Sequence, residues 1–236
     1  MKNYKYSNGE VEIKNTSQSI YDNFNDFIFS DDVTVFSKLV ARFDLFNRVI
    51  NVPGDIVECG VYKGSGILTW LKIKRVLTPN NLKKVIGFDM FDDDDLVDIL
   101  SGEDKIKMKN LFEVRNFEYK NYAPKLEQII LDAGFTQADF ELIKGDASIT
   151  TKDFVNKRPG FKISLLYLDM DIEKPTYDTL VNFWDRVSRG GIVVLDEYAH
   201  HQWSESLGVD KFLKEKNLTI EILQNHSFPS AIIRKP

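Results

Sequence analysis

Four acidic residues follow two apolar runs in the second half of the chain, and their spacing suits metal or proton chemistry. Asp169 and Asp171 follow one run, and Asp196 with Glu197 follows the next. If these runs are neighbouring strands, their ends lie about 5 Å apart, and like charges that close need a cation to neutralise them. An oxygen-only cluster with no nearby cysteine suits Mg²⁺, Ca²⁺ or Mn²⁺ rather than structural zinc. We therefore predict a metal site at Asp169, Asp196 and Glu197, with helix capping as the alternative role for these residues.

Asp171 lies two residues beyond Asp169, so we expect it to reach the same ion less directly. A metal-coordinated hydroxyl loses its proton more easily, and we predict that Asp171 is the general base that takes this proton. Lys174 could serve as a base only if desolvation lowered its pKa, which the nearby carboxylates oppose. His200 and His201 form a pair in a later loop. They could bind metal, act as a base or contact substrate, or they could simply be exposed.

A glycine-rich turn follows the first apolar run, where residues 58–66 read ECGVYKGSG and lead into a helix. Glycines let the backbone approach a ligand closely, and the N-terminus of the helix offers free N–H groups to a carboxylate or phosphate. The spacing differs from GxGxxG, and the chain contains no P-loop GKS/T, which argues against an ATPase. By itself, this turn fits either a nucleotide site or a tight structural turn.

Two further acids follow later apolar runs and complete an adenosine-sized pocket. Asp89 ends the second run, 29 residues after Gly60, where an acid accepts hydrogen bonds from ribose hydroxyls in such folds. Capping of the following helix is the alternative role for Asp89. Asp146 and Ala147 follow the third run, where an adenine amino group can meet the carboxylate or the neighbouring backbone. Together with the glycine turn, these residues predict a site for an adenosine-containing cofactor.

Short apolar runs that alternate with helix-length segments must position these residues. The runs are Asp55–Gly60, Lys84–Asp89, Phe140–Asp146, Ile163–Asp169, Gly191–Glu197, Leu218–Leu223 and Ala231–Arg234. Helical spacing covers Phe36–Phe46, Ile67–Val76 and Tyr177–Val187, and we expect Gly190-Gly191 to end the last of these helices. Buried strands alternating with helices predict an α/β, Rossmann-like fold, with a mostly parallel seven-stranded sheet flanked by helices.

Two segments lie outside this alternation. Residues 1–31 are polar and weakly patterned, and we expect an N-terminal arm, a lid or a dimerisation segment ahead of the domain at 32–236. The long stretch Phe91–Lys125 opens with the acidic run Asp92–Asp95, with Asp98 close behind. Such a run is typical of a solvated face or a helix start, and an insertion at the substrate rim is the alternative.

Composition narrows the classes of partner. The 236 residues carry a formal net charge of −5, which argues against a general nucleic-acid binder. The single cysteine, Cys59, excludes an intramolecular disulfide, suits a buried strand position and points to a reducing compartment. No apolar run approaches the roughly 20 residues that span a bilayer, and the N-terminal residues are too polar for a signal peptide. We therefore predict a cytoplasmic protein with a small-molecule substrate and no nucleic-acid or membrane partner, and we leave homo-oligomerisation open.

A wider pattern is carried by four segments: Val52–Gly66 (VPGDIVECGVYKGSG), Val85–Asp92 (VIGFDMFD), Leu165–Leu180 (LLYLDMDIEKPTYDTL) and Gly190–Tyr198 (GGIVVLDEY). Together they resemble the TylF/macrocin O-methyltransferase family, and the turn also resembles that of catechol-type O-methyltransferases. The similarity covers roughly Asp32 to Leu213. It implies a class I methyltransferase fold, S-adenosylmethionine as methyl donor, a divalent metal with Mg²⁺ as first candidate, and a hydroxyl acceptor on a sugar or sugar-containing metabolite.

The resemblance also assigns roles to individual residues. It implies a metal held by Asp169, Asp196 and Glu197, with Asp171 as the base. The cofactor would be bound by a set that runs from its methionine end to its adenine: Glu58, Gly60, Tyr62, Gly64, Ser65, Asp169, Asp89, Asp146 and Ala147. One position departs from the family, which usually has Asp-Asp where this chain has Asp196-Glu197. Glutamate can still ligate, but its longer arm can change the ion or leave only outer-sphere contact.

Two other functions stay open on sequence alone. An NAD(P)-dependent dehydrogenase or epimerase shares the fold but normally has GxGxxG and a Tyr-x-x-x-Lys dyad, and this chain lacks that glycine spacing. A non-catalytic nucleotide-binding module would have to retain four convergent carboxylates without a metal.

Overall fold

The computed structural model describes residues 4–6, 9–11, 18–115, 119–223 and 228–236. The chain divides into two compact units, Met1–Phe36 and Ser37–Pro236. The first unit contains an antiparallel pair, β1 (Tyr4–Tyr6) and β2 (Gly9–Val11), and the helix α1 (Gln18–Phe29). The predicted arm of residues 1–31 falls in this unit. Parts of it lie outside the described residues, and its role as a lid or dimerisation segment stays a prediction.

The second unit is built on a seven-stranded sheet with the order β5-β4-β3-β6-β7-β9-β8. Its strands are β3 (Asp55–Cys59), β4 (Val85–Asp89), β5 (Phe140–Lys144), β6 (Ile163–Leu168), β7 (Val187–Leu195), β8 (Glu221–Ile222) and β9 (Ala231–Arg234). The five strands from β5 to β7 are parallel, whereas β9 is antiparallel to both of its neighbours. Each predicted apolar run overlaps one of these strands, so the predicted α/β fold and mostly parallel sheet are confirmed.

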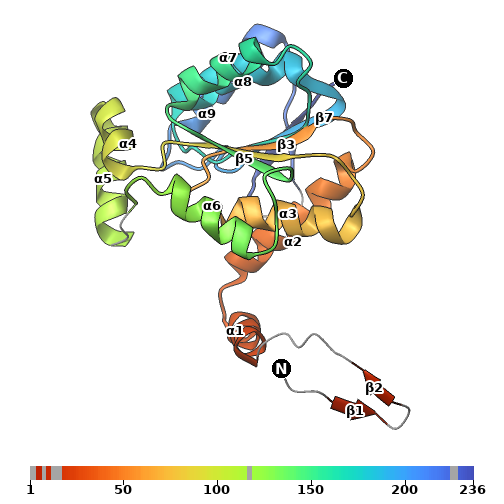
Figure 1. Ribbon diagram of the computed structural model, residues 1–236. Helices are drawn as coiled ribbons and strands as arrows, with labels where there is room; N and C mark the ends of the chain where they lie inside the picture. The colour runs from red at the N-terminus through yellow and green to blue at the C-terminus, as the bar shows by residue number, and fades with distance from the viewer. Residues whose placement is uncertain (1–3, 7–8, 12–17, 116–118, 224–227) are drawn as a thin grey trace. The chain divides into compact units, whose positions relative to one another are not determined.

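Helices cover both faces of this sheet (Figure 1). One face carries α2 (Val33–Val49), α3 (Ser65–Leu77) and α6 (Ala123–Asp132), and the other carries α7 (Ala147–Lys157), α8 (Glu173–Phe183) and α9 (Glu205–Lys216). The helices α4 (Asp93–Ile99) and α5 (Gly102–Arg115) lie beside these layers. Among the described helices, none is both long enough and apolar enough to cross a bilayer.

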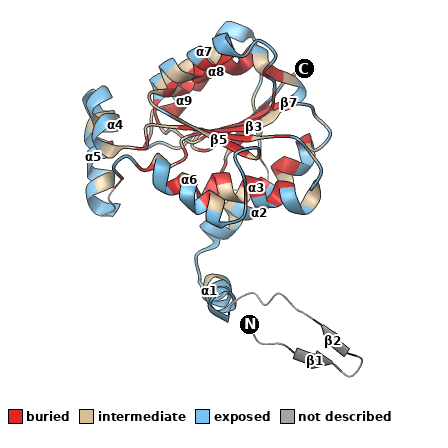
Figure 2. Ribbon diagram, in the orientation of Figure 1, coloured by how far each residue is buried: buried red, intermediate tan, exposed pale blue. Residues whose placement is uncertain are grey.

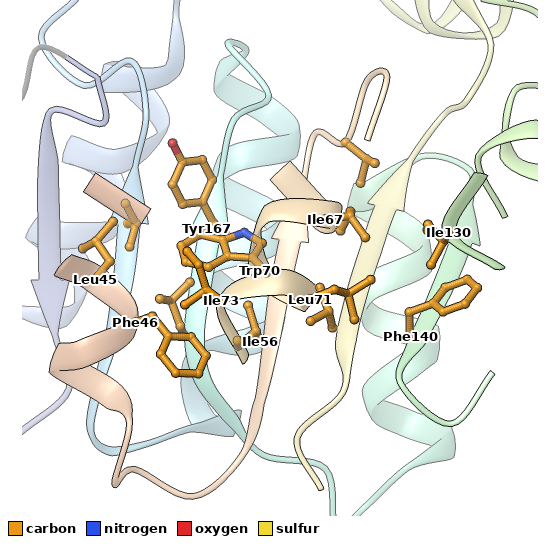
Figure 3. Close-up of a cluster of buried hydrophobic side chains, with 14 of the residues drawn as sticks. Leu45, Phe46, Ile56, Ile67, Trp70, Leu71, Ile73, Ile130, Phe140 and Tyr167 are labelled. Carbon is orange, nitrogen blue, oxygen red and sulfur yellow. The ribbon is translucent and has the colours of Figure 1, made fainter. Parts of the chain in front are cut away.

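Two hydrophobic cores form because successive strand residues point to opposite faces of the sheet. Ile56 of β3 packs in the cluster that contains Phe46 of α2 and Trp70 of α3 (Figure 3). Its neighbour Val57 packs in the other cluster, with Phe183 of α8. The helices on the two faces accordingly bury the stripe that faces the sheet and expose the opposite one (Figure 2). The sheet is therefore anchored on both faces, and its strand ends are held in fixed positions.

The prediction that Gly190-Gly191 ends a helix is wrong. The helix α8 ends at Phe183, a 3-10 turn (Trp184–Arg186) follows, and β7 begins at Val187 and runs through both glycines. The register with β6 shifts at this point. Gly190 has a φ of 78°, and a Cβ on Gly191 would lie 2.9 Å from the Ser164 carbonyl oxygen. The glycines therefore serve an irregularity inside the strand, where a side chain does not fit.

The acidic run at Asp92 begins a helix, as one of the two interpretations predicts. The Asp92 carboxylate accepts a hydrogen bond from the Asp95 backbone N–H and caps α4.

The central strands give a direct test of the fold. Leu166 of β6 is fully buried, so Leu166→Ala should lower the free energy of unfolding by about 2–5 kcal/mol through lost burial and the cavity left behind. Leu82 is 94% exposed, so Leu82→Ala should change it by less than about 0.5 kcal/mol. Urea denaturation measures both variants. Equal losses in the two would contradict the assignment of β6 to the centre of the sheet.

Candidate functional site

The carboxyl ends of β3, β4, β5 and β6 open onto one cavity of about 560 Å³, which we call the strand-end cavity. It lies at the point where the strand order reverses between β3 and β6, which is where open α/β sheets bind ligands. The predicted site residues that line it are Glu58, Gly60, Tyr62, Ser65, Asp89, Asp146, Ala147, Asp169, Asp171 and Glu197. Four other predicted residues are outside its lining, namely Gly64, Asp196, His200 and His201. Its volume is typical of a small-molecule site.

The glycine turn brings the ends of β3 and β6 into contact. Gly60 has a φ of 89°, and a Cβ there would lie 1.8 Å from the Asp169 carbonyl oxygen, so the position accepts only glycine. A Cβ on Gly66 would lie 1.9 Å from Glu58 Oε1. Gly64 takes the left-handed conformation before α3 and packs on Leu126. The first two glycines thus allow close approaches within the site, and Gly64 shapes the helix start.

Asp89 holds this turn with both carboxylate oxygens. Its Oδ2 accepts hydrogen bonds from the backbone N–H groups of Val61 and Tyr62, at 2.6 and 2.9 Å. Its Oδ1 accepts from the Phe91 N–H and the Tyr119 hydroxyl, at 2.7 and 2.9 Å. A carboxylate offers about four acceptor positions, so these donors use its capacity. Asp89 is therefore a turn-holding residue, and its contact with a ribose stays a prediction.

Glu58 and Arg42 form a buried ion pair beneath the turn. Arg42 Nη2 lies 3.3 Å from Glu58 Oε1, and its guanidinium also lies 4.9 Å from the centre of the Tyr167 ring. Burial raises the pKa of Glu58 to about 7, although Arg42 opposes the shift. The second oxygen, Glu58 Oε2, is buried and has no hydrogen-bond partner among the described residues. Glu58 lines the cavity, where its carboxylate could pair with a cationic ligand group.

A lysine lies between the carboxylates that end β6 and β7. Lys38 Nζ lies 2.8 Å from Asp196 Oδ2 and 3.8 Å from Asp169 Oδ2. The hydroxyl of Tyr167 donates a hydrogen bond to the other oxygen of Asp196, whose side chain is fully buried. Burial and the charge of Asp196 raise the pKa of Asp169 well above its usual range. Each oxygen of Asp196 thus has one protein donor, and Asp196 does not line the cavity, whereas Asp169 does.

Three more acidic residues lie near Asp169 and Asp196. Burial raises the pKa of Asp171 to about 7, with further contributions from Glu197 and Asp196. Burial and Asp196 raise the pKa of Glu197 to about 7 as well. Glu205, at the start of α9, is fully buried, and burial followed by the charge of Asp171 raises its pKa well above the usual range. Its Oε1 accepts a hydrogen bond from the Glu197 N–H at 3.2 Å, and its own N–H donates to the Asp171 carbonyl at 3.0 Å.

The predicted metal ligands lie in this region, but their ligand atoms do not all lie close to one another. Across the described ranges, the group of acidic ligand atoms that lie within 4.8 Å of one another is Asp92, Asp93 and Asp94, at the surface-exposed start of α4. Asp169, Asp196 and Glu197 do not form such a group, and Lys38 occupies the space between two of them. A metal held by these three residues therefore stays a prediction.

The three alternative bases, His200, His201 and Lys174, differ in whether they line the cavity. His200 Nδ1 lies 3.0 Å from Glu197 Oε2, and the His200 ring stacks on His201 with centroids 5.3 Å apart. Neither histidine lines the cavity, and a catalytic role for them stays a prediction. Lys174 does line the cavity, but its ammonium pairs with Asp178 at 2.8 Å, and this hydrogen bond raises its pKa. A base needs the opposite shift.

Lys38, Arg42 and Glu205 were not among the residues predicted from the sequence. The first two carried a signal, because they continue the stripe of Leu45 and Val49 at helical spacing, and a basic residue within an apolar stripe needs a buried partner. Glu205 carried none, since an acid in the first turn of a helix is commonly exposed. The stretch from α4 to α5 also contributes apolar lining to the cavity, namely Leu96, Ile99, Leu100, Met108, Leu111 and Phe112. An insertion at the substrate rim stays a prediction for this stretch.

Residues 43–228 match the macrocin-O-methyltransferase (TylF) family. The chain belongs to this family. The TylF family is one of S-adenosylmethionine-dependent O-methyltransferases, which confirms the resemblance noted in the sequence and disfavours the dehydrogenase alternative.

Individual relatives agree with the TylF assignment. The chain is 27% identical over 158 residues to a demethyldecarbamoylnovobiocin O-methyltransferase of Streptomyces niveus, with 63% of this chain and 54% of the relative covered. It is 29% identical over 155 residues to a rhamnosyl-tetracenomycin-C 4'-O-methyltransferase of Streptomyces olivaceus, with the same coverage. The chain therefore spans about half the length of these curated relatives.

Solved structures confirm the class I methyltransferase fold. A TDP-rhamnose 3'-O-methyltransferase of calicheamicin biosynthesis superposes with a TM-score of 0.70 at 24% identity, over 94% of this chain and 88% of that one. The O-methyltransferase NovP gives a TM-score of 0.70 at 22% identity, over 85% and 80% of the two chains. At these identities the likeness is evidence for the fold alone.

The four hydrogen bonds that Asp89 accepts predict that replacing its carboxylate lowers both the stability of the protein and its affinity for the ligand. An amide in Asp89→Asn accepts hydrogen bonds through one atom only and turns its NH₂ group toward two of the four donors. We expect the free energy of unfolding to fall by about 1–3 kcal/mol and the Kd for S-adenosylhomocysteine to rise about tenfold. Denaturation and calorimetry measure the two effects, with Asp132→Asn on the surface of α6 as the matched control. Weaker binding with unchanged stability would show that Asp89 acts on the ligand alone.

Proposed function

We propose that this chain transfers the methyl group of S-adenosylmethionine to a hydroxyl of a sugar or sugar-containing metabolite, with a divalent metal at the ends of β6 and β7. One observation carries the proposal: the wall of a single cavity holds both the glycine turn after β3 and the carboxylates after β6 and β7. The curated relatives are named for methylation of a novobiocin precursor and of a rhamnosyl group, which supports the substrate class. Small-molecule partners and a cytoplasmic location are part of the same proposal.

The methyl donor fits the side of the cavity built by β3, β4 and β5. The unpartnered Glu58 Oε2 suits the ammonium group of the methionine moiety, and the N-terminus of α3 suits its carboxylate. Tyr62 and Ser65 line the same end of the cavity. The adenine would lie against Ala147 and Asp146, which caps α7 by accepting a hydrogen bond from the Ser148 N–H at 2.8 Å.

A divalent metal fits the chemistry of the donor set at the other side. Five carboxylates gather there, of Asp169, Asp171, Asp196, Glu197 and Glu205, and Lys38 is the cation that pairs directly with two of them. Hard oxygen donors with surplus negative charge suit Mg²⁺. We propose Asp169, Asp196 and Glu197 as its ligands. When bound, the ion would orient the acceptor hydroxyl and make its proton easier to remove.

Asp171 is the residue we propose as the base that takes that proton. It lines the cavity, and a pKa of about 7 lets its carboxylate accept a proton near neutral pH. The backbone at Asp171 is left-handed, with a φ of 65°, and the Glu205 N–H holds its carbonyl. With the proton taken up by Asp171, the acceptor oxygen would bond to the methyl carbon. The carbon–sulfur bond would break, and its electron pair would return to sulfur to give S-adenosylhomocysteine.

The helices α4 and α5 suit the acceptor. Met108 is buried and Phe112 is half-buried, and both line the same cavity as the carboxylates. Trp203 lines the same cavity and offers an aromatic face to a sugar ring. An acceptor with one polar edge and one apolar face fits this wall.

Methyl transfer to glycosylated natural products tests the proposed activity. With radiolabelled S-adenosylmethionine and a panel of deoxysugar glycosides, we expect label in at least one acceptor. Excess EDTA should abolish transfer, and Mg²⁺ or Mn²⁺ should restore it. Full transfer in the presence of chelator would return Asp169, Asp196 and Glu197 to structural roles.

Asp169 and Asp171 should fail in different ways. Asp169→Asn should raise the metal concentration needed for half-maximal activity, because a neutral amide is a poorer ligand for a hard cation. Asp171→Asn should leave metal and cofactor affinity nearly unchanged but lower kcat by about 10²–10⁴-fold, the usual contribution of a positioned base. This deficit should shrink as pH rises, because solvent hydroxide can replace the base. An Asp171→Asn enzyme that recovers fully with added metal would make Asp171 a ligand and leave the base unassigned.

A further inference from the structure

Lys38 stands at the position that the proposed metal would occupy. We propose that the Lys38 ammonium competes with the divalent ion for Asp169 and Asp196, so that the ion binds only by displacing this lysine. The inference rests on the metal site of the proposed function, and it assigns to Lys38 control over the affinity of that site.

The distances from the Lys38 ammonium to Asp169 and Asp196 are the basis for the proposed competition with a metal ion. The ammonium is 2.8 Å from Asp196 Oδ2 and 3.8 Å from Asp169 Oδ2, so it bridges the ends of β6 and β7. A divalent ion bound by the same two oxygens would lie about 2.0–2.6 Å from each of them. An ammonium nitrogen and a metal ion cannot both fit between the two oxygens at these distances. One cation therefore excludes the other.

Asp196 cannot avoid the competition by turning to another oxygen. Its side chain is fully buried, and the Tyr167 hydroxyl already donates to its other oxygen. Oδ2 is the atom left for a cation, and Lys38 holds it. Without any cation there, Asp196 would be a buried carboxylate balanced only by a hydroxyl, which is strongly unfavourable. The lysine therefore keeps the site stable when no metal is bound.

Lys38 is able to leave, whereas its partners are fixed. Its side chain is 29% exposed and ends a flexible four-carbon stem, so its ammonium has a path to solvent. The Phe228 ring, 5.7 Å from Nζ, offers a neighbouring face on which a displaced ammonium can rest. The carboxylates are anchored at strand ends and cannot follow it. Displacement costs one ion pair and leaves the strands in place.

At sufficient concentration, a divalent ion can displace the Lys38 ammonium from the carboxylates. The ammonium forms ion pairs with Asp169 and Asp196 but not with Glu197, whose Oε2 lies 3.0 Å from His200 Nδ1. An ion of charge +2 that also takes Glu197 as a ligand neutralises more of the cluster than one ammonium does. The result is a site that binds metal reversibly rather than permanently.

Mn²⁺ binding to the full chain, measured by calorimetry and by electron paramagnetic resonance, tests the inference without reference to activity. Lys38→Met keeps the length of the side chain and removes its charge, and we expect it to bind Mn²⁺ at least about tenfold more tightly than the parent. Lys72→Met removes the same charge from an exposed position on α3 and should bind like the parent. Lys38→Arg keeps a competing cation and should bind no more tightly than the parent.

A second readout covers the case in which Lys38→Met is unstable. Without metal its melting temperature should fall below that of the parent, and saturating Mn²⁺ should raise it by more than it raises the parent's. Equal or weaker Mn²⁺ affinity in Lys38→Met would overturn the competition and leave the proposed metal site standing. Absence of Mn²⁺ binding in both the parent and Lys38→Met would overturn the metal site and the competition together.

Discussion

Buried negative charge at the ends of β6 and β7 is the constraint around which the rest of the site is arranged. Asp169 and Asp196 follow two central strands whose cores exclude water, so their charge has to be balanced locally. The balance comes from α2, which supplies Lys38 to these acids and Arg42 to Glu58. The packing of one helix on the sheet is therefore also the electrostatic support of the site. Burial, and after it the neighbouring negative charges, also raise the pKa values of Asp171 and Glu197.

Most of the fold was predictable because it depends on local periodicity. Buried parallel strands have continuous apolar runs, and the acids that end them mark the functional edge of the sheet. The prediction that Gly190 and Gly191 end a helix was wrong because glycines that end a helix and glycines inside an irregular strand look alike in sequence. Only the pairing of β7 with β6 separates the two cases.

The sequence predicted which residues lie at the site better than it predicted the contacts that their side chains make. Ten of the expected residues line the cavity, since strand ends fix where they lie. What each side chain contacts depends on segments far apart in the sequence. Asp89 meets Tyr119 across 30 positions, and Lys38 meets Asp196 across 158. Periodicity carries no information about such pairs, so the turn-holding role of Asp89 and the presence of Lys38 emerged only in three dimensions.

The four hydrogen bonds to Asp89 and the close approach of Gly60 to Asp169 have a consequence for the thermodynamics of binding. They order the cofactor turn during folding, before any ligand arrives. A ligand that meets a rigid turn loses little affinity to the ordering of protein backbone, since that entropy is already spent. The donor half of the cavity is in this sense preorganised. Under the proposed function, variation in the α4–α5 wall would alter which acceptor fits without changing how the methyl donor is held.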